Sequence, residues 1–377
     1  MKNNSFFILV LNSGSATVKY SLFKADNLVL ENEGIVERIG LKGGVKNHEE
    51  AVKKILKDLT QVKKIKDLSK IRTVGHRVVH GGEKFKKTTL LNKKKIEELK
   101  GYSKLAPLHN PPNIMGIEVC QKLLPQAKQV AVFDTAFHTT LPPSSYIYAI
   151  PYKFYSQHQI RRYGFHGISH QYVSERARET VGGKISRLIT CHLGGGSSIT
   201  AIKNGKSVDT SMGFTPLEGL VMESRSGDID PAIVTYLITE LNFTAQEVYD
   251  ILNKKSGYKG ICGKKDFREI LKIKSKDRLT RLAYEIFVLS VTKYIGKYIA
   301  ELGGVDIIVF TAGIGEGSWE LRKDVMEHFK FVGIKLDQKK NKNNSLIIST
   351  PNSKVKVLVV PDNEALKIAK EAQKITK

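Results

Sequence analysis

The hydrophobic pattern of the chain alternates between short apolar runs and longer segments with helical spacing. Apolar runs at 6–11, 17–23 and 34–39 predict three strands of an antiparallel meander near the N-terminus. Runs of the same kind predict a second meander at 188–193, 198–203 and 206–210. Each meander is followed by alternating helical and buried-strand patterns, which is typical of the α/β class. Two such halves, joined without a low-complexity linker, indicate an internal duplication.

Helical periodicity and end signals predict the remaining elements. Thr244 with Glu247 forms a capping box that opens one helix, and Pro111 and Pro112 precede another. Helices are predicted at 49–59, 92–104, 113–124, 231–241, 245–253, 279–302, 318–330 and 364–375. Buried strands are predicted at 72–80, 129–133, 305–311 and 355–360.

Three turns rich in glycine and serine follow apolar strands. They are "NSGS" at 12–15, "GGG" at 194–196 and "GIGEG" at 313–317. A two-residue hairpin turn needs at most two glycines, so three in a row indicate backbone that a ligand approaches closely. Backbone N–H groups in such turns bind anionic oxygens. The sequence therefore predicts cradles for phosphate groups, in a cleft where two of these turns face each other.

The chain of 377 residues is strongly basic, with 61 Lys and Arg residues against 37 Asp and Glu residues and a formal charge of +24. A nucleic-acid surface is one explanation of the lysine clusters, but aromatic residues do not interleave with them as a stacking platform requires. The explanation that we favour is solvated helix faces. The excess charge would also attract small anionic substrates.

The cysteines and the apolar segments indicate where the protein works. Three cysteines without CxxC spacing argue against a disulfide framework or a zinc site and favour a reducing compartment. The N-terminal apolar run is too short for a secretory signal, and the long apolar segment at 283–299 is interrupted by charges. We therefore expect a cytoplasmic protein that binds neither nucleic acid nor membrane.

Polar side chains that could carry chemistry lie on or after the apolar strands. Arg77 stands between apolar residues, where a cation needs an anionic partner; a purely structural salt bridge is the alternative. Asp134 follows a buried strand, and His166 and Arg225 lie on glycine-flanked loops. Lys19 could neutralise a phosphate or be an ordinary exposed lysine. Nucleophile-elbow, HExxH and P-loop motifs do not occur, and the set fits phosphoryl transfer.

Nine segments spread over nearly the whole chain carry a resemblance to a known family. They read "NSGSATVKYSLF", "VGHRVVHGGEKF", "APLHNPPNIMGI", "FDTAFHTTLP", "RRYGFHGISHQYV", "CHLGGGSS", "TSMGFTPLEGL", "RSGDIDPAI" and "FTAGIGE". From Ile8 to about Ala369 the chain resembles the acetate kinases. The resemblance implies a duplicated ribonuclease-H-like fold of the actin and sugar-kinase type, with two domains around a nucleotide cleft. It also implies the reaction ATP + acetate ⇌ ADP + acetyl phosphate by direct in-line transfer, with Mg²⁺ or Mn²⁺, in a homodimer.

The resemblance further implies a role for each matching residue. Asp134 is the implied catalytic aspartate, His166 and Arg225 stabilise the transition state, and Arg77 binds acetate. The implied acetate site consists of Arg77, Val79, Leu108, Phe165 and Pro216. The implied ATP contacts are Lys19, His192, Leu193, Gly194, Gly195, Gly196, Asp266, Phe267, Arg268, Gly313, Ile314, Gly315, Glu316 and Gly317. The implied magnesium-linked pair is Asn12 and Glu364.

Three positions depart from the usual pattern of the acetate kinases. Gly195 and Gly317 stand where asparagine is common, and Glu223 stands where glycine is common. The acceptor itself bears on the role of Asp134. Acetate has a pKa of roughly 4–5 and is already ionised at neutral pH, so the nucleophile needs no general base. We predict that Asp134 orients a cation or an arginine rather than removing a proton.

We predict a first domain at 1–135 and 366–377, closed by the C-terminal helix, and a second, nucleotide-binding domain at 136–365. A propionate or butyrate kinase is the nearest alternative, because one methylene changes binding by only about 1–3 kcal/mol; Val79 favours acetate. A non-enzyme alternative is an actin-like nucleotide-binding structural protein, which would not need Arg77, Arg225 and His166 together.

Overall fold

The structure is a computed structural model, and it describes residues 6–61, 65, 67–107 and 109–377. These residues form two compact units. Unit 1 comprises the described chain up to Thr139 together with Gly167–Ser169 and Asn363–Lys377, and unit 2 comprises Thr140–His166 and His170–Asp362. The C-terminal segment thus returns to the unit in which the described chain begins. The domain boundaries derived from the sequence stay a prediction.

Unit 1 is built on a six-stranded mixed sheet in the order β3-β2-β1-β4-β6-β5. The first three strands form the antiparallel meander that the sequence predicts, and β4 and β6 run parallel to β1. The strands are β1 (Phe7–Ser13), β2 (Thr17–Lys24), β3 (Leu30–Glu37), β4 (Ile71–Val78), β5 (Thr89–Leu90) and β6 (Lys128–Phe133). The carboxyl ends of β1, β4 and β6 therefore meet at one edge of the sheet.

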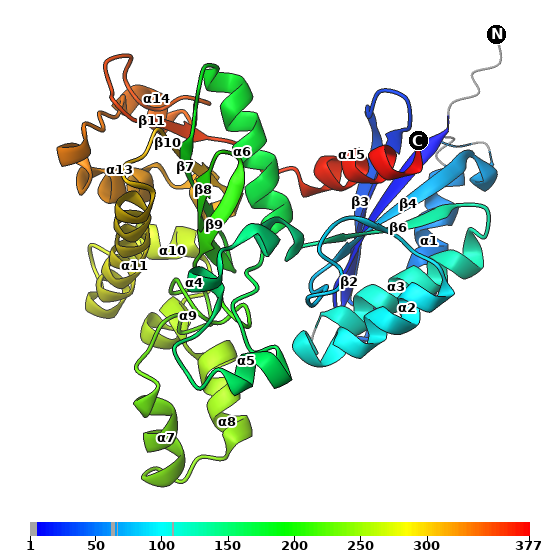
Figure 1. Ribbon diagram of the computed structural model, residues 1–377, viewed down its shortest axis with the longest axis horizontal. Coiled ribbons are helices and arrows are strands. Elements are labelled where there is room, and N and C mark those ends of the chain that lie inside the picture. The colour runs from blue at the N-terminus through cyan, green and yellow to red at the C-terminus, as the bar shows by residue number, and fades with distance from the viewer. Residues whose placement is uncertain (1–5, 62–64, 66, 108) are drawn as a thin grey trace. The chain divides into compact units, whose positions relative to one another are not determined.

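Alternate residues of β1 bury the two faces of this sheet, as the two-residue period of a strand requires. Leu9 and Leu11 belong to a core with α1 and α3, whereas Ile8 and Val10 belong to a core with α15. In Figure 1 the C-terminal α15 and the pair α2 and α3 lie on opposite sides of the sheet. These helices are α1 (His48–Gln61), α2 (Lys93–Lys100), α3 (Asn110–Leu123) and α15 (Glu364–Thr376).

Unit 2 repeats this arrangement in a five-stranded sheet of order β11-β10-β7-β8-β9. Here β7, β8 and β9 form an antiparallel meander, and β10 and β11 extend it in parallel to β7. The strands are β7 (Arg187–Leu193), β8 (Ser197–Lys203), β9 (Lys206–Thr210), β10 (Ile307–Thr311) and β11 (Lys356–Val359). Apart from the extra edge strand β5, the two sheets have the same strand order and directions. The predicted duplication and α/β class are confirmed.

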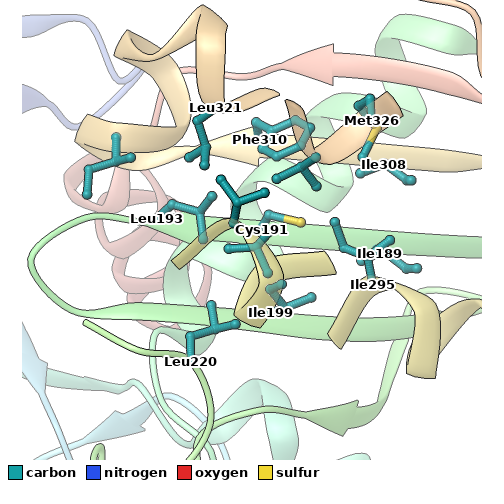
Figure 2. Packing of buried hydrophobic residues seen from close by; sticks show 14 of the residues in the cluster. Ile189, Cys191, Leu193, Ile199, Leu220, Ile295, Ile308, Phe310, Leu321 and Met326 are labelled. Atoms are coloured by element: carbon teal, nitrogen blue, oxygen red, sulfur yellow. The ribbon is translucent and has the colours of Figure 1, made fainter. Parts of the chain in front are cut away.

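The core of unit 2 forms where this sheet packs on the long helix α11 (Arg278–Leu302) and on α13 (Trp319–Glu327). Figure 2 shows Cys191 and Phe310 of the sheet among apolar side chains that include Ile295 of α11 and Leu321 of α13. Every residue of β10 is buried. A strand covered on both faces reads as a continuous apolar run, which is why its position was visible in the sequence.

The remaining helices fall partly where the sequence places them. They are α4 (Pro143–Tyr146), α5 (Lys153–His158), α6 (Gly167–Val181), α7 (Ala232–Thr239), α8 (Ala245–Asp250), α9 (Gly257–Cys262), α10 (Phe267–Ile273), α12 (Ala312–Gly317) and α14 (Gln338–Lys342). The capping box is confirmed, because Glu247 N donates to Thr244 Oγ1 at 3.2 Å and Thr244 N donates to Glu247 Oε2 at 2.8 Å. Within the described ranges, no helix combines the length and apolarity that crossing a bilayer requires.

Three predicted segments need correction. Pro111 and Pro112 were expected to precede a helix at 113–124, but they lie in the first turn of α3, which begins at Asn110. The helix expected at 92–104 ends as an α-helix at Lys100 and continues as a 3₁₀ turn, Gly101–Leu105. The segment 313–317 was expected to be a glycine-rich turn before a helix at 318, but it is itself the short helix α12. Glu316 explains this, because its carboxylate reaches back to accept the N–H of Ala312 at 2.9 Å at the start of that helix. The carboxylate of Glu316 thereby accepts a backbone N–H at the start of the helix, which glycine cannot do because it has no side-chain acceptor.

Candidate active site

The first cluster of predicted site residues lies in unit 1, where β1, β4 and β6 end. Asn12 is near the end of β1, Arg77 is near the end of β4, and Asp134 directly follows β6. Glu364 is the first residue of α15, which packs on the same strands. Hydrogen bonds hold Asp134 in place, since its N–H donates to Val78 O and its carbonyl accepts from Gly167 N. The parallel topology thus gathers four polar side chains from distant parts of the sequence.

Arg77 is the centre of this cluster. Its Nε and Nη2 donate to the two carboxylate oxygens of Asp134 at 3.0 and 2.5 Å. Its Nε also lies 3.6 Å from Oε2 of Glu364, and its Nη1 donates to Oδ1 of Asn12 at 3.4 Å. The prediction that a cation on this strand needs an anionic partner is confirmed. The forked pair with Asp134 is the geometry in which an arginine–carboxylate bond is strongest.

Asp134 is only 1% exposed. Burial raises the pKa of its carboxyl to about 6, and the nearby charge of Glu364 adds to the rise while Arg77 opposes it. Both oxygens of this carboxylate accept hydrogen bonds from Arg77, so the carboxylate fixes the plane of the guanidinium. This arrangement agrees with a positioning role for Asp134.

The other predicted residues of unit 1 surround the cluster. Lys19 is exposed on β2 and stands directly opposite Asn12 in the β1–β2 register, so the two side chains share a face. Val79 is buried directly after β4, and its N–H donates to Asn113 Oδ1 at 3.1 Å. Leu108 lies outside the described residues. Lys19 belongs to unit 1, whereas all other implied ATP contacts belong to unit 2.

The triple glycine forms the connection between β7 and β8, from Gly194 to Gly196. None of the three has a positive φ, so backbone strain does not explain them. A Cβ on Gly196 would lie 3.4 Å from Cε1 of His166 and 3.5 Å from Nη1 of Arg225. The glycine at this position therefore keeps open a space that an imidazole and a guanidinium both border.

His166 precedes α6 in a left-handed conformation, with φ of 55° and ψ of 22°. Its ring stacks on that of His192 with centroids 4.2 Å apart. Its Nδ1 lies 2.9 Å from Oγ of Ser198. A non-glycine residue with this φ is uncommon and persists where surrounding contacts hold it. The loop thus fixes the imidazole beside the glycine turn.

Arg225 has a different environment from Arg77. Its Nη1 donates to the carbonyl of Pro216 at 3.1 Å and lies 3.6 Å from Sδ of Met222. Among the described residues, no carboxylate forms an ion pair with it. Burial lowers the pKa of its guanidinium, and Tyr249 and Glu223 partly offset this. Arg225 is a half-buried cation whose charge is available to an anionic ligand.

A pocket of about 450 Å³ in unit 2 brings together eight of the implied ATP contacts. These are Gly194, Gly195, Asp266, Phe267, Arg268, Gly313, Ile314 and Gly317. Glu223, Tyr258, Lys265, Leu271 and Ser318 complete its lining. Two glycine-rich segments and one helix start therefore meet at one concave site, which is the usual form of a small-ligand pocket.

Asp266, Phe267 and Arg268 mark the start of α10 at this pocket. Asp266 caps the helix by accepting the N–H of Arg268 at 2.8 Å, and the guanidinium of Arg268 bonds the same carboxylate. The hydrogen bonds from Arg268 lower the pKa of Asp266 to about 2. Most of Phe267 is buried in the core, where its ring packs against Phe287.

Several implied ATP contacts do not line this pocket. Leu193 is buried in the core of unit 2, and His192 lies under the ring of His166. Gly315 is buried against Cys191 and Phe310. The carboxylate of Glu316 is occupied, since it accepts the N–H groups of Ala312 and Asp362, both at 2.9 Å.

The remaining implied acetate contacts lie close to Arg225 and His166 in the chain. Phe165 is 2% exposed, directly before His166. Pro216 is half-buried, and its carbonyl is the group that accepts from Arg225. These two residues belong to unit 2, whereas Val79 belongs to unit 1.

Sequence reasoning missed three residues next to the site. Ser198, His170 and Thr190 form a hydrogen-bonded row that ends at His166, and each is fully buried. One signal was present, because His170 lies one helical turn after His166, which directly precedes α6. Thr190 and Ser198 carried no signal, since small polar residues occur in many strands.

The implied magnesium-linked pair, Asn12 and Glu364, offers only oxygen atoms as metal ligands. No group of three or more His, Cys, Asp and Glu side chains within the described residues could hold a metal ion. Asn12 and Glu364 offer an amide oxygen and a carboxylate, both with only long contacts to Arg77. Mg²⁺ prefers such hard oxygen ligands and is often held by one or two side chains plus substrate phosphates. The residues present therefore fit a magnesium ion that arrives with a nucleotide.

Comparison with known proteins identifies the family. The family model described as "Acetokinase family" matches residues 7–370. The chain is 50% identical over 388 residues to an acetate kinase of Carboxydothermus hydrogenoformans, covering 97% of this chain and 98% of that protein. It is also 50% identical over 395 residues to an acetate kinase of Thermotoga maritima, covering 98% of each.

Solved structures of related kinases support the same family. The acetate kinase of Porphyromonas gingivalis superposes with a TM-score of 0.94 at 42% identity, over 99% of this chain and 100% of that one. A propionate kinase of Francisella tularensis superposes with a TM-score of 0.93 at 41% identity, over 98% and 99%. The duplicated fold of the actin and sugar-kinase type is confirmed. The chain therefore belongs to the acetokinase family, and it is a phosphotransferase with a carboxyl group as acceptor.

Proposed function

We propose that the chain catalyses the reversible, Mg²⁺-dependent transfer of the γ-phosphoryl group of ATP to acetate, which yields acetyl phosphate and ADP. The observation that carries this proposal is the position of Arg225. It is a half-buried cation without a carboxylate partner among the described residues, and with His166 it borders the open space over Gly196. Preorganised donors of this kind stabilise the charge that spreads over a transferring phosphoryl group.

The transfer is direct and in line. A carboxylate oxygen of acetate forms a bond to phosphorus while the bond from phosphorus to the β–γ bridging oxygen breaks, and that oxygen leaves with ADP. No proton moves in this step, because acetate is already ionised. Asp134 orients Arg77 through its forked ion pair, and Arg77 holds the acetate carboxylate.

The nucleotide lies in the pocket of unit 2, with its phosphates toward the turn from Gly194 to Gly196. Asn12 and Glu364 would hold the magnesium ion, which would supply charge neutralisation to the phosphates. Lys19, opposite Asn12 on the same face of the sheet, adds positive charge for the phosphates. The eight implied ATP contacts that line the pocket support this assignment.

The resemblance to the acetate kinases assigns Val79, Leu108, Phe165 and Pro216 to the methyl group of acetate. Propionate remains the second candidate, because the chain resembles the Francisella tularensis propionate kinase almost as closely as the Porphyromonas gingivalis acetate kinase. One methylene group discriminates by about 1–3 kcal/mol, so overall similarity does not decide between the two acids.

The enzyme is a cytoplasmic homodimer in this proposal. Helix α7 has no buried residue, although its sequence AIVTYLIT is almost wholly apolar. Ile233, Tyr236 and Leu241 are 44%, 57% and 51% exposed. An apolar patch of this kind favours contact with a second copy of the chain. In analytical ultracentrifugation, the unchanged protein should sediment as a dimer and Tyr236→Glu as a monomer. A monomeric unchanged protein would contradict the assignment.

ADP release with acetate, propionate and butyrate tests the proposed reaction. We expect the highest kcat/KM with acetate, and formation of an acyl phosphate that hydroxylamine traps. A higher kcat/KM with propionate would keep the reaction class and change the substrate. Absence of turnover with all three acids would contradict the proposal and favour a nucleotide-binding structural protein.

A further inference from the structure

We propose that Thr190, His170 and Ser198 form a hydrogen-bonded relay that sets which ring nitrogen of His166 carries the proton. This inference deepens the proposed function, because it rests on His166 as a donor to the transferring phosphoryl group. The three residues are positioning residues in this account. Their action on the reaction passes through His166.

The relay is continuous and buried. Oγ1 of Thr190 lies 2.7 Å from Nδ1 of His170, Nε2 of His170 lies 2.7 Å from Oγ of Ser198, and that oxygen lies 2.9 Å from Nδ1 of His166. Thr190 and Ser198 sit on neighbouring strands of the sheet, while His170 lies on α6. Thr190, His170 and Ser198 are each 0% exposed, so water does not compete for these bonds.

The hydrogen bonds of the relay can run in two directions, and the two directions place the proton of His166 on different ring nitrogens. In the first, the Thr190 hydroxyl donates to His170 Nδ1, His170 Nε2–H donates to Ser198, and the Ser198 hydroxyl donates to His166 Nδ1. The proton of His166 is then on Nε2. In the second, every bond is reversed, His166 carries its proton on Nδ1, and Nε2 presents a lone pair.

Thr190 decides between the two directions. Its hydroxyl makes one hydrogen bond among the described residues, the one to His170. In the reversed row that oxygen accepts from His170, and the buried hydroxyl proton is left without an acceptor. An unsatisfied buried donor is costly, whereas the forward row uses every proton. Thr190 thereby fixes the direction from the far end of the row.

The chosen direction matches the chemistry at the other end. Nε2 of His166 lies 3.5 Å from the Cβ position of Gly196, and Nη1 of Arg225 lies at the same distance from that position. Phosphoryl oxygens accept hydrogen bonds, so an Nε2–H assists Arg225 there, whereas a lone pair on Nε2 repels the oxygens. The relay therefore prepares His166 as a donor before substrate arrives.

The test replaces Thr190 by valine, which keeps the branched shape and removes the hydroxyl, and by serine, which keeps the hydroxyl. NMR of ¹⁵N-histidine-labelled enzyme without substrates reports the tautomer of His166, assigned by the signals that a His166→Gln variant loses. We expect Nε2–H in the unchanged protein and in Thr190→Ser, and a mixture of tautomers in Thr190→Val. We also expect kcat to fall about tenfold in Thr190→Val with the KM for acetate and ATP within about twofold, and to stay within about twofold in Thr190→Ser.

If Thr190→Val changed neither the tautomer of His166 nor kcat, the proposed relay would be overturned. Ser198→Ala provides a second probe if the valine variant unfolds, and it should likewise mix the tautomers of His166. The NMR result is independent of turnover. If the tautomer shifts as expected but no carboxylate is phosphorylated, the relay stands and the proposed function fails. If carboxylates are phosphorylated but the tautomer does not shift, the relay fails alone.

Discussion

Arg77 and Arg225 are both implied site arginines, but their surroundings differ in kind. Arg77 lies in a cluster with Asn12, Asp134 and Glu364, and its fork is bonded to a buried carboxylate. Arg225 bonds a backbone carbonyl and has no carboxylate partner among the described residues. In the sequence, Arg77 stands between apolar residues and Arg225 lies on a glycine-flanked loop, but neither pattern names the partner of its arginine.

These different surroundings suit the two arginines to different roles. A paired arginine is rigid, because both oxygens of Asp134 fix its plane, and it is suited to positioning a carboxylate of a substrate. An arginine without a counter-ion is partly desolvated and gains most from an anion that appears during the reaction. We therefore expect removal of Arg77 to act mainly on stability and substrate binding, and removal of Arg225 to act mainly on the rate of transfer.

The largest expected effect on folding comes from Arg77→Ala. This change leaves the carboxylate of Asp134 buried without its partner, and breaking a buried pair in this way costs about 3–5 kcal/mol of unfolding free energy. Arg176→Ala is the matched control, because Arg176 is exposed and pairs only along its own helix with Glu179. Chemical denaturation measures both. A loss below about 1 kcal/mol for Arg77→Ala would show that the pair is not a structural element.

Gly196→Ala should act on the other cluster, with little effect on folding. The added Cβ would lie 3.4 Å from His166 and 3.5 Å from Arg225, which is ordinary contact, but it fills the space proposed for a phosphoryl oxygen. We expect kcat to fall about 10- to 100-fold, in line with the cost of a small misplacement of reacting groups. Gly296→Ala in α11 is the control, since its Cβ would meet only Phe329 at 3.9 Å. Equal kcat in the two variants would remove Gly196 from the site.

The pH dependence of stability should reveal Asp134. Its pKa is about 6 in the folded protein and near 3.8 when unfolded, so between these values the folded state binds more protons than the unfolded state. The stability supplied by this group is therefore complete below about pH 4 and is lost as the pH rises through about 6. One proton corresponds to at most about 1.4 kcal/mol per pH unit.

Asp134→Asn should remove this slope between pH 4 and 6. The difference from the unchanged protein isolates the group, because Glu301, whose pKa burial raises to about 7, contributes a slope of the same sign in both proteins. Parallel stability curves for the two proteins would mean that Asp134 does not retain its proton in that range.

The smallest expected effect concerns Glu223. Its Oε2 lies 3.3 Å from the Cβ position of Gly195, and the two residues line the nucleotide pocket together. Glu223→Gln removes a negative charge that repels the phosphates, so the KM for ATP should fall about two- to fivefold, and less at high salt. Glu269→Gln, on α10, is the control, because Glu269 does not line the pocket. A higher KM in Glu223→Gln would indicate that the carboxylate binds the nucleotide complex favourably.

The strands of the two sheets were easier to predict from the sequence than the side-chain partners and the backbone conformation at the site. Continuous apolar runs such as the one in β10 located the buried strands, and the repeat of the meander revealed the duplication. The partner of Arg77 could be expected in kind but not named, because Asp134 is 57 residues away and only the parallel topology joins them. The helical form of 313–317 was missed, since glycines indicate a turn unless another residue, here Glu316, supplies the cap.

Steady-state kinetics of Arg225→Ala beside Arg77→Lys tests the central claim most directly. Lysine keeps the charge at position 77 but loses the fork that fits a carboxylate. We predict that Arg225→Ala lowers kcat about 10²- to 10³-fold with the KM for acetate within about threefold, and that Arg77→Lys raises the KM for acetate more than it lowers kcat. The reverse result, a high KM for acetate in Arg225→Ala with kcat retained, would contradict the division of roles between the two arginines.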